Sequence, residues 1–190
     1  MVTAIWYVLR TGCPWRDVPG GFGPWSSVYT RWRRWCECGL WARMLALLSR
    51  GATGALRHLD CSHIKLHQHG ANPRGGQSTQ GIGRTKGGLN TKLAAVVDAT
   101  GRVVAMSLAA GQRHDLKAIA PLVPALRGKR GQRPCGSFHR GYYRHRHHVE
   151  NFFCRIKRFR RISTRYDKLA RTFLAFVQLA AILDWLTHGV

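Results

Sequence analysis

Basic side chains outnumber acidic ones almost fourfold in this sequence: 31 Lys and Arg residues stand against 8 Asp and Glu residues in a chain of 190. The formal net charge is +23, and the positive side chains repel one another in a compact state, which destabilises the folded chain. Enzymes that act on small metabolites rarely carry such a charge. The natural partner of such a surface is a polyanion, of which nucleic acid is the commonest.

The apolar content suits a folded core, because 45% of the residues are hydrophobic and the length fits one domain or a core with a small accessory domain. The longest apolar stretch, residues 172–186, is interrupted by Gln178 and Asp184 and is shorter than the ~20 residues that span a membrane. The start of the chain lacks the basic region and the cleavage site of a secretory signal. We therefore expect neither a membrane protein nor a secreted one.

The cysteines predict a reducing compartment, most simply a cytoplasm. No C-x2-C pair occurs, and Cys36 and Cys38 are spaced too tightly for a zinc site. Most of the others lie in periodic apolar segments, where a reduced cysteine behaves as a small hydrophobic residue. The six positions are Cys13, Cys36, Cys38, Cys61, Cys135 and Cys154.

Residues 1–50 predict a helical segment divided by Gly and Pro turns. A short apolar helix ends near Gly12, and a second helix begins near Pro24. A break at Gly39 precedes an apolar helix that reaches about Leu48. The second helix carries Arg31, Arg33 and Arg34 between aromatic residues. A turn followed by an Arg-rich helix is typical of a helix-turn-helix DNA-binding segment; the alternative is a three-helix packing module whose arginines face water.

The remainder alternates strand and helix patterns, which predicts an α/β domain over residues 53–190. The first strand, 58–66, places Asp60, Ser62 and Ile64 on one face. Two further strands flank the hairpin turn Asp98-Ala99-Thr100-Gly101. The predicted later elements are strands 93–97 and 102–108, a helix from its N-cap Asp115 to Leu126, a basic linker over 127–141, and helices over 142–163 and 167–187.

One helix combines an apolar face with a polar edge. Tyr143, Arg146, Glu150 and Lys157 fall within an arc of about 60° at 100° per residue. A neighbouring arc is apolar and includes Val149. Glu150 borders the apolar arc, which indicates the lip of a cleft. The alternative is that Glu150 is an ordinary surface ion-pair partner.

The spacing Tyr143-x2-Arg146-x3-Glu150-x6-Lys157 matches the Y-x2-R-x3-E-x6-K signature of DDE transposases of bacterial insertion sequences, and residues 146–177 resemble the insertion-sequence-five-like branch. The resemblance extends over most of the chain, with its motifs in the family's order. These motifs are C-P-W-R-D-V-P-G-G-F-G-P-W-S-S-V-Y-T-R-W-R-R-W (13–35), L-D-C-S-H-I (59–64), G-R-T-K-G-G-L-N-T-K (83–92) and G-Q-R-H-D (111–115).

The resemblance implies an RNase H-like catalytic core over 53–190, in which carboxylates hold two Mg²⁺ or Mn²⁺ ions that drive strand cleavage and transfer. Asp60 and Glu150 would be the catalytic, metal-binding carboxylates. The DNA-binding residues would be Tyr143, Arg146 and Lys157, together with Arg31, Arg33 and Arg34 of the N-terminal segment. The implied partners are terminal inverted repeats and target DNA, bound by a homo-oligomer at the bacterial nucleoid.

The sequence departs from the family pattern at the second catalytic Asp. The segment between Leu126 and Tyr142 contains no acidic residue, which implies a truncated copy deleted around 127–141. Asp98 fits a turn-initiating role and Asp115 a helix cap, so neither is assigned as the missing ligand. We therefore expect an impaired transposase; the alternatives are a non-catalytic nucleic-acid-binding protein and an unstable transposase relic.

Overall fold

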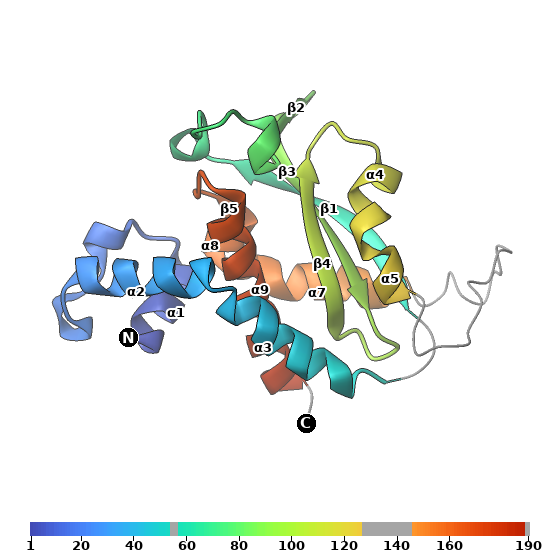
Figure 1. Ribbon diagram of the computed structural model, residues 1–190, viewed down its shortest axis with the longest axis horizontal. Coiled ribbons are helices and arrows are strands. Elements are labelled where there is room, and N and C mark those ends of the chain that lie inside the picture. The colour runs from blue at the N-terminus through green and yellow to red at the C-terminus, as the bar shows by residue number, and fades with distance from the viewer. Residues whose placement is uncertain (54–56, 127–145, 189–190) are drawn as a thin grey trace, which may run out of the picture.

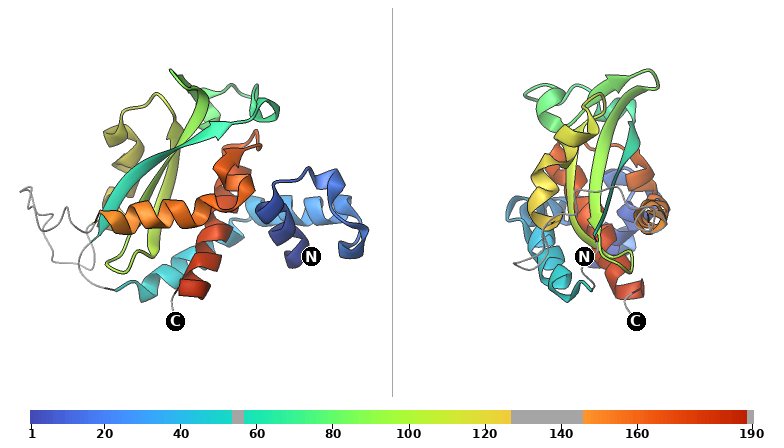
Figure 2. Two further views of the ribbon diagram at one scale, coloured as in Figure 1. Left: turned by 180° about the vertical axis from the view of Figure 1, so that it is seen from behind. Right: turned by 90° about the vertical axis from the view of Figure 1, so that its right-hand side faces the viewer.

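The computed structural model describes residues 1–53, 57–126 and 146–188, and shows a curled, mostly antiparallel sheet with helices on both faces (Figures 1 and 2). The strands are β1 (His58–Leu66), β2 (Gly83–Thr85), β3 (Gly88–Val97), β4 (Val103–Ala110) and β5 (Thr164–Arg165). The helices are α1 (Val2–Thr11), α2 (Trp25–Glu37), α3 (Leu40–Leu48), α4 (Asp115–Ile119), α5 (Val123–Leu126), α7 (His147–Lys157), α8 (Arg160–Ser163) and α9 (Ala170–His188). The mixture of helix and strand agrees with the predicted α/β class.

The three N-terminal helices form where the sequence predicts them. Gly12 ends α1 with φ 71°, and Gly39 separates α2 from α3 with φ 67°. Both angles lie in the left-handed region, which glycine enters without a steric cost. However, α1 and α2 are joined by residues 12–24, which include two 3₁₀ turns, a much longer connection than the turn of three or four residues in a helix-turn-helix.

The sheet has β3 at its centre, paired antiparallel with β1 on one side and with β2 and β4 on the other. In the register Asp60 lies opposite Ala95, and Cys61 opposite Ala94. Ala95 belongs to the larger core beneath one face, whereas Ala94 belongs to a smaller cluster under α4 on the other face. The predicted alternation of β1 is therefore confirmed. Asp60 lies on the face that packs against α7 and α9.

The predicted hairpin turn is confirmed between β3 and β4. Oδ1 of Asp98 accepts hydrogen bonds from the backbone N–H groups of Thr100 and Arg102, both at 3.0 Å. Gly101 adopts φ 83°, as a turn with a left-handed position requires. Both strands are longer than predicted, because β3 begins at Gly88 and β4 ends at Ala110.

Three helices differ in their bounds from those that the sequence predicts. The helix expected from Asp115 to Leu126 is broken into α4, a 3₁₀ turn and α5, because the sequence places Pro121 and Pro124 inside it. Its N-cap is His114 rather than Asp115. The next helix is described only from α7 onward and ends where Phe159 turns extended; residues 142–145 lie outside the described residues. The last helix starts at Ala170, after the unpredicted strand β5.

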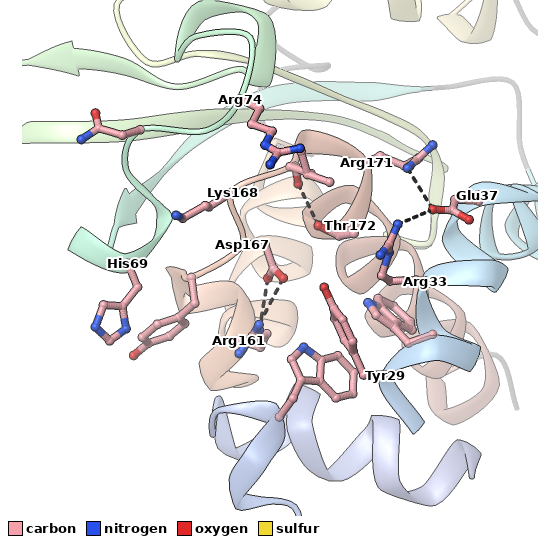
Figure 3. Close-up of a pocket in the computed structure, with 15 residues that line it drawn as sticks. Tyr29, Arg33, Glu37, His69, Arg74, Arg161, Asp167, Lys168, Arg171 and Thr172 are labelled. Atoms are coloured by element: carbon pink, nitrogen blue, oxygen red, sulfur yellow. Dashed lines mark hydrogen bonds and ion pairs between the residues drawn. The ribbon is translucent and has the colours of Figure 1, made fainter. Parts of the chain in front are cut away.

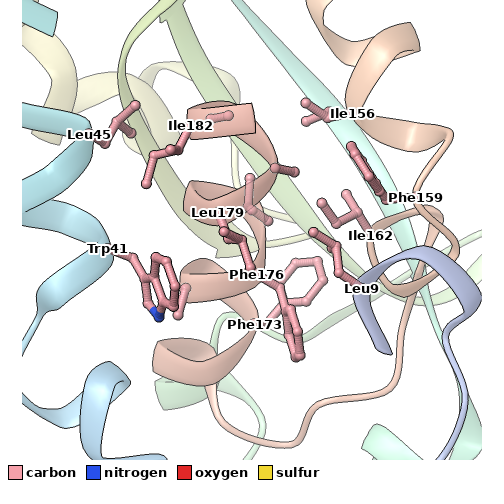
Figure 4. Packing of buried hydrophobic residues seen from close by; sticks show 14 of the residues in the cluster. Leu9, Trp41, Leu45, Ile156, Phe159, Ile162, Phe173, Phe176, Leu179 and Ile182 are labelled. Atoms are coloured by element: carbon pink, nitrogen blue, oxygen red, sulfur yellow. The ribbon is translucent and has the colours of Figure 1, made fainter. Parts of the chain in front are cut away.

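The largest core surrounds α9 (Figure 4). Phe173, Phe176 and Ala180 of this helix are fully buried. The window 170–187 is long and apolar enough to cross a membrane, but 61% of it is buried inside the protein, as is usual for the core helix of a folded domain.

One core joins the two segments that the sequence separates at residues 50–53. Trp32 of α2 is 1% exposed and stacks on Phe176 of α9, with ring centroids 4.1 Å apart. Leu9 of α1 and Leu45 of α3 belong to the same cluster. The N-terminal helices are therefore held rigidly against the C-terminal helix rather than attached by a loose linker.

Replacing Trp32 by Ala tests this shared core. We expect the free energy of unfolding to fall by about 4 kcal/mol, because a large buried aromatic side chain is lost from the contact between α2 and α9. The measurement is urea unfolding followed by far-ultraviolet circular dichroism. The matched control is Trp25→Ala on the exposed start of the same helix, with an expected loss below about 1 kcal/mol. An equal, small effect of both substitutions would contradict the shared core.

Candidate functional site

Two of the predicted carboxylates meet at one arginine. Asp60 is the third residue of β1, and Glu150 lies in the first turn of α7. Nη2 of Arg146 lies 2.9 Å from Oδ2 of Asp60, and Nε of Arg146 lies 3.4 Å from Oε1 of Glu150. The side chains are 24%, 56% and 45% exposed for Asp60, Glu150 and Arg146, respectively, so the group is open to solvent. The structure thus brings together three residues predicted for the site.

Lys157 completes the polar edge of α7. Its Nζ donates to Oγ of Ser62 at 2.6 Å, two residues along β1 from Asp60 on the same face. The apolar arc of α7, including Val149 and Ile156, is buried as predicted. The polar edge therefore faces β1 while the apolar arc packs into the core. Ser62 was not predicted as a partner, although its position in the strand alternation pointed to this face.

The remaining predicted DNA-binding residues lie elsewhere. Tyr143 falls outside the described residues. Arg31, Arg33 and Arg34 are exposed on α2, which lies far along the molecule from the start of α7 (Figures 1 and 2). Nη2 of Arg33 pairs with Glu37 at 3.1 Å. The structure therefore separates the predicted residues of α2 from those of α7.

All eight acidic residues of the chain lie among the described residues, and ion pairs occupy most of them. Apart from Asp60 and Glu150, which share Arg146, five carboxylates are bound to a cation elsewhere. These pairs are Glu37 with Arg33 and Arg171, Asp98 with Arg102, Asp115 with Lys92, Asp167 with Arg161, and Asp184 with Arg155. The eighth, Asp17, is exposed in the loop before α2. The chain offers Asp60 and Glu150 as its one convergent pair of carboxylates at this face.

Asp115 is separated from Asp60 by the sheet itself. Its Oδ1 accepts a hydrogen bond at 2.6 Å from Nζ of Lys92, and this pairing lowers the pKa of the Asp115 carboxyl below its usual range. Lys92 and Ala94 are two residues apart in β3, so their side chains lie on the same face of the sheet, the face covered by α4. Asp115 therefore lies across the sheet from Asp60 and cannot share a metal ion with it.

Asp98 is fully buried and committed to the hairpin turn. Burial alone would raise the pKa of its carboxyl, but hydrogen bonds from the backbone N–H groups of Thr53, Arg102 and Thr100 hold that pKa below its usual range. Its Oδ2 also accepts from the guanidinium of Arg102 at 3.2 Å. The predicted turn role is confirmed, and this carboxylate has no position at the site.

The carboxylates at the site do not fit a two-metal centre. Among the described residues, no group of three His, Cys, Asp or Glu side chains is placed to hold a metal ion. Asp60 and Glu150 converge on a guanidinium, and the sequence outside the described residues contains no acidic residue. Burial raises the pKa of the neighbouring Cys61 thiol to about 11, so it does not supply a thiolate at neutral pH.

Comparison with known proteins links the N-terminal segment to transposases. A family model described as "Putative transposase of IS4/5 family" matches residues 1–45. The chain is 46% identical over 44 residues to "Putative transposase for insertion sequence element IS6501" from Brucella ovis, and 46% identical over 50 residues to "Insertion element IS402 uncharacterized 16.2 kDa protein" from Burkholderia cepacia. It is 37% identical over 71 residues to "Uncharacterized protein y4sN" from Sinorhizobium fredii.

These alignments are partial. They cover 23%, 25% and 37% of this chain, and 34%, 33% and 57% of the respective relatives. No solved structure matches the chain. The similarities support a transposase relationship, and the family model places it on residues 1–45, which contain α2.

The role of Asp98 can be tested through the pH dependence of stability. Because its folded pKa is depressed, the carboxylate contributes stability above its ordinary pKa near 4 and loses that contribution as pH falls through the lower folded value. We expect Asp98→Asn to cost about 3 kcal/mol at pH 7 and less at pH 3, measured by urea unfolding. The matched control, Asp17→Asn, replaces an exposed carboxyl and should cost below about 0.5 kcal/mol. A cost of Asp98→Asn that is equal at both pH values would contradict this interpretation.

Proposed function

We propose that this chain is a DNA-binding protein of the insertion-sequence transposase type, in the insertion-sequence-five-like branch, with impaired strand-transfer activity. The observation that carries the proposal is the exposed basic face of α2, within the residues that match the transposase family. The hairpin of β3 and β4 beside β1 supports the RNase H-like fold that the resemblance implies. The partners would be terminal inverted repeats and target DNA, bound by a homo-oligomer in the bacterial cytoplasm.

The face of α2 has the chemistry of a phosphate-binding surface. Ser26, Ser27, Thr30, Arg31 and Arg34 line a shallow concavity along it. Hydroxyl and guanidinium groups supply most of the contacts that position proteins on DNA phosphates. Packing of the opposite face into the core fixes these side chains on a rigid helix. The arrangement supports backbone binding in preference to the alternative, a packing module whose arginines only face water.

The impaired activity follows from the carboxylates. The metal-dependent chemistry of the family would be supplied by divalent cations held by carboxylates, and Asp60 and Glu150 are the candidates at this site. Both are paired with Arg146, and the ammonium of Lys157 on the same edge of α7 balances the remaining negative charge. A positive field attracts DNA but opposes the capture of a divalent cation. In this state Arg146 and Lys157 fix the polar edge of α7 against β1.

Salt dependence tests DNA binding. Contacts with about eight phosphates would give a slope near −7 for the logarithm of the binding constant against the logarithm of salt concentration. Replacing Arg31 and Arg34 together by Ala should weaken binding to every duplex sequence and reduce the slope by about 2, because two phosphate contacts are lost. The measurement is fluorescence anisotropy of a labelled duplex over a salt series.

The matched control removes the same formal charge from the opposite side of the sheet. Arg113 and Lys117 are exposed beside and within α4, and their joint replacement by Ala should leave the slope nearly unchanged. Equal effects of the two double variants would show that net charge, rather than the face of α2, determines binding. A binding constant that is insensitive to salt would overturn DNA binding itself.

Strand cleavage tests the impaired activity. We expect purified protein in Mg²⁺ or Mn²⁺ to nick a terminal-repeat duplex no faster than Glu150→Gln, because the described carboxylates do not assemble a two-metal centre. The readout is product formation on a denaturing gel, with both proteins prepared identically. Robust cleavage that disappears in Glu150→Gln would contradict the expectation and establish a working catalytic site. Robust cleavage at the same rate by both proteins would come from a contaminating nuclease.

A further inference from the structure

A pocket of about 470 Å³ opens where three distant parts of the chain meet (Figure 3). Its walls come from Trp15 and α2, from the turn around His69 to Arg74, and from the segment 161–172 that leads from α8 into α9. It contains none of the residues of the Asp60 and Glu150 site. No spacing in the sequence predicts the pocket, because its walls are more than thirty residues apart along the chain.

Aromatic rings form one side of the pocket. Trp15 and Tyr29 lie with ring centroids 5.4 Å apart, and Trp15 stacks on Phe176 of α9 at 6.0 Å with an interplanar angle of 27°. Trp15 and Tyr29 are half-buried, and the Tyr29 ring projects into the pocket between Arg33 and the Arg161–Asp167 pair (Figure 3). Because the aromatic rings support one another, a flat ligand would meet a surface that is already in place.

Cations dominate the rim. The lining includes five Lys and Arg side chains but two carboxylates, Glu37 and Asp167. Glu37 is shared by Arg33 at 3.1 Å and by Arg171 at 3.5 Å, so the charge of this trio remains positive. Arg74 and Lys168 are exposed, and no ion pair or side-chain hydrogen bond of either is found within the described residues.

The wall from segment 161–172 is fixed by buried arginines. Both guanidinium contacts of Arg161 with the Asp167 carboxylate are 3.1 Å long. Arg165 is fully buried and donates to the carbonyl oxygens of Asp167 at 2.8 Å and of Lys168 at 3.1 Å. The Lys168 backbone is therefore held in place, and its ammonium extends from a rigid wall.

We propose that this pocket binds one unpaired nucleotide of a DNA strand, an inference that rests on the proposed DNA-binding function. A base would stack on the aromatic side, where every base offers a flat face regardless of sequence. Its phosphate would lie at the rim beside Arg74 and Lys168. The volume lies in the range of small-ligand pockets, and a base inside a duplex stack does not expose the ring face that the aromatic side requires.

Helix α2 connects this pocket with the proposed duplex-binding face. Tyr29 and Arg33, one turn apart, line the pocket, whereas Arg31 and Arg34 line the outer concavity. A strand that separates from a duplex bound along α2 would therefore meet the pocket on the adjacent face of the same helix. Duplex and unpaired nucleotide would be bound side by side.

The test compares a blunt duplex with the same duplex that carries a short single-stranded tail, by fluorescence anisotropy with the full chain. We expect the tail to strengthen binding by the wild-type protein about tenfold, as the stacking of one base on an aromatic side chain does. Tyr29→Leu should remove this gain and bind the blunt duplex as the wild type does, whereas Tyr29→Phe should keep the gain.

Lys168→Ala provides a second variant that cannot disturb the core, since its side chain is exposed. It should reduce the gain from the tail and lower the salt slope by about 1 for the tailed duplex alone. Lys117→Ala is the matched control and should change neither value. A gain from the tail that persists in Tyr29→Leu and Lys168→Ala would overturn the assignment of the pocket.

The outcomes separate this proposal from the function on which it rests. Salt-dependent binding of the blunt duplex with no gain from the tail would overturn the pocket assignment and leave the DNA-binding function in place. A failure to bind either duplex would overturn both. A deoxynucleoside monophosphate is the third probe, and its binding is followed by quenching of tryptophan fluorescence. If the quenching is lost in Tyr29→Leu and Lys168→Ala while the tail brings no gain, the pocket binds free nucleotides and the assignment to a DNA strand is wrong.

Discussion

The burial of α9 is the constraint on which the rest of the structure depends. This helix carries apolar residues around most of its circumference, so it is stable only when other elements enclose it. The N-terminal helices cover one side, and β4, α7 and α8 cover others. Two buried polar groups of α9 are paired: Arg155 of α7 donates to Asp184 at 2.7 Å, and the Trp185 indole donates to the carbonyl of Val103 at 2.7 Å. The sheet and the N-terminal helices therefore pack against the same helix.

The elements that the sequence predicted well are those set by local chemistry. The strand 58–66 has the predicted bounds, because its alternating pattern separates two cores. In residues 1–50, Gly12 ends α1, Pro24 precedes α2 and Gly39 separates α2 from α3, and the backbone preferences of these residues act locally. The hairpin at Asp98 is equally local, since its hydrogen bonds stay almost entirely within the turn. The polar edge of α7 followed from helical periodicity alone.

The features that escaped prediction depend on contacts between distant residues. Arg146 bridges to Asp60 across 86 positions, which no periodicity can indicate. The strand β5 is two residues long and exists because Thr164 and Arg165 align with the end of β1. The pocket beside Tyr29 likewise requires knowledge of how α2 docks on α9. The family resemblance predicted Asp60 and Glu150 as a pair. The sequence could not show which other carboxylates lie near them, because that depends on the ion pairs of the folded chain.

Because nearly every carboxylate is paired, the protein tolerates the replacement of an acidic residue less well than that of an exposed basic residue. Asp98, Asp167 and Asp184 are almost completely enclosed, each beside an arginine. Replacing one such acid leaves its arginine without a partner and lowers the free energy of unfolding by about 3–5 kcal/mol. An exposed cation such as Arg43 or Arg50 can disappear at almost no thermodynamic cost. Neutral substitution would therefore remove positive charges from the surface more readily than it would remove the few buried acids that pair with arginines in the interior.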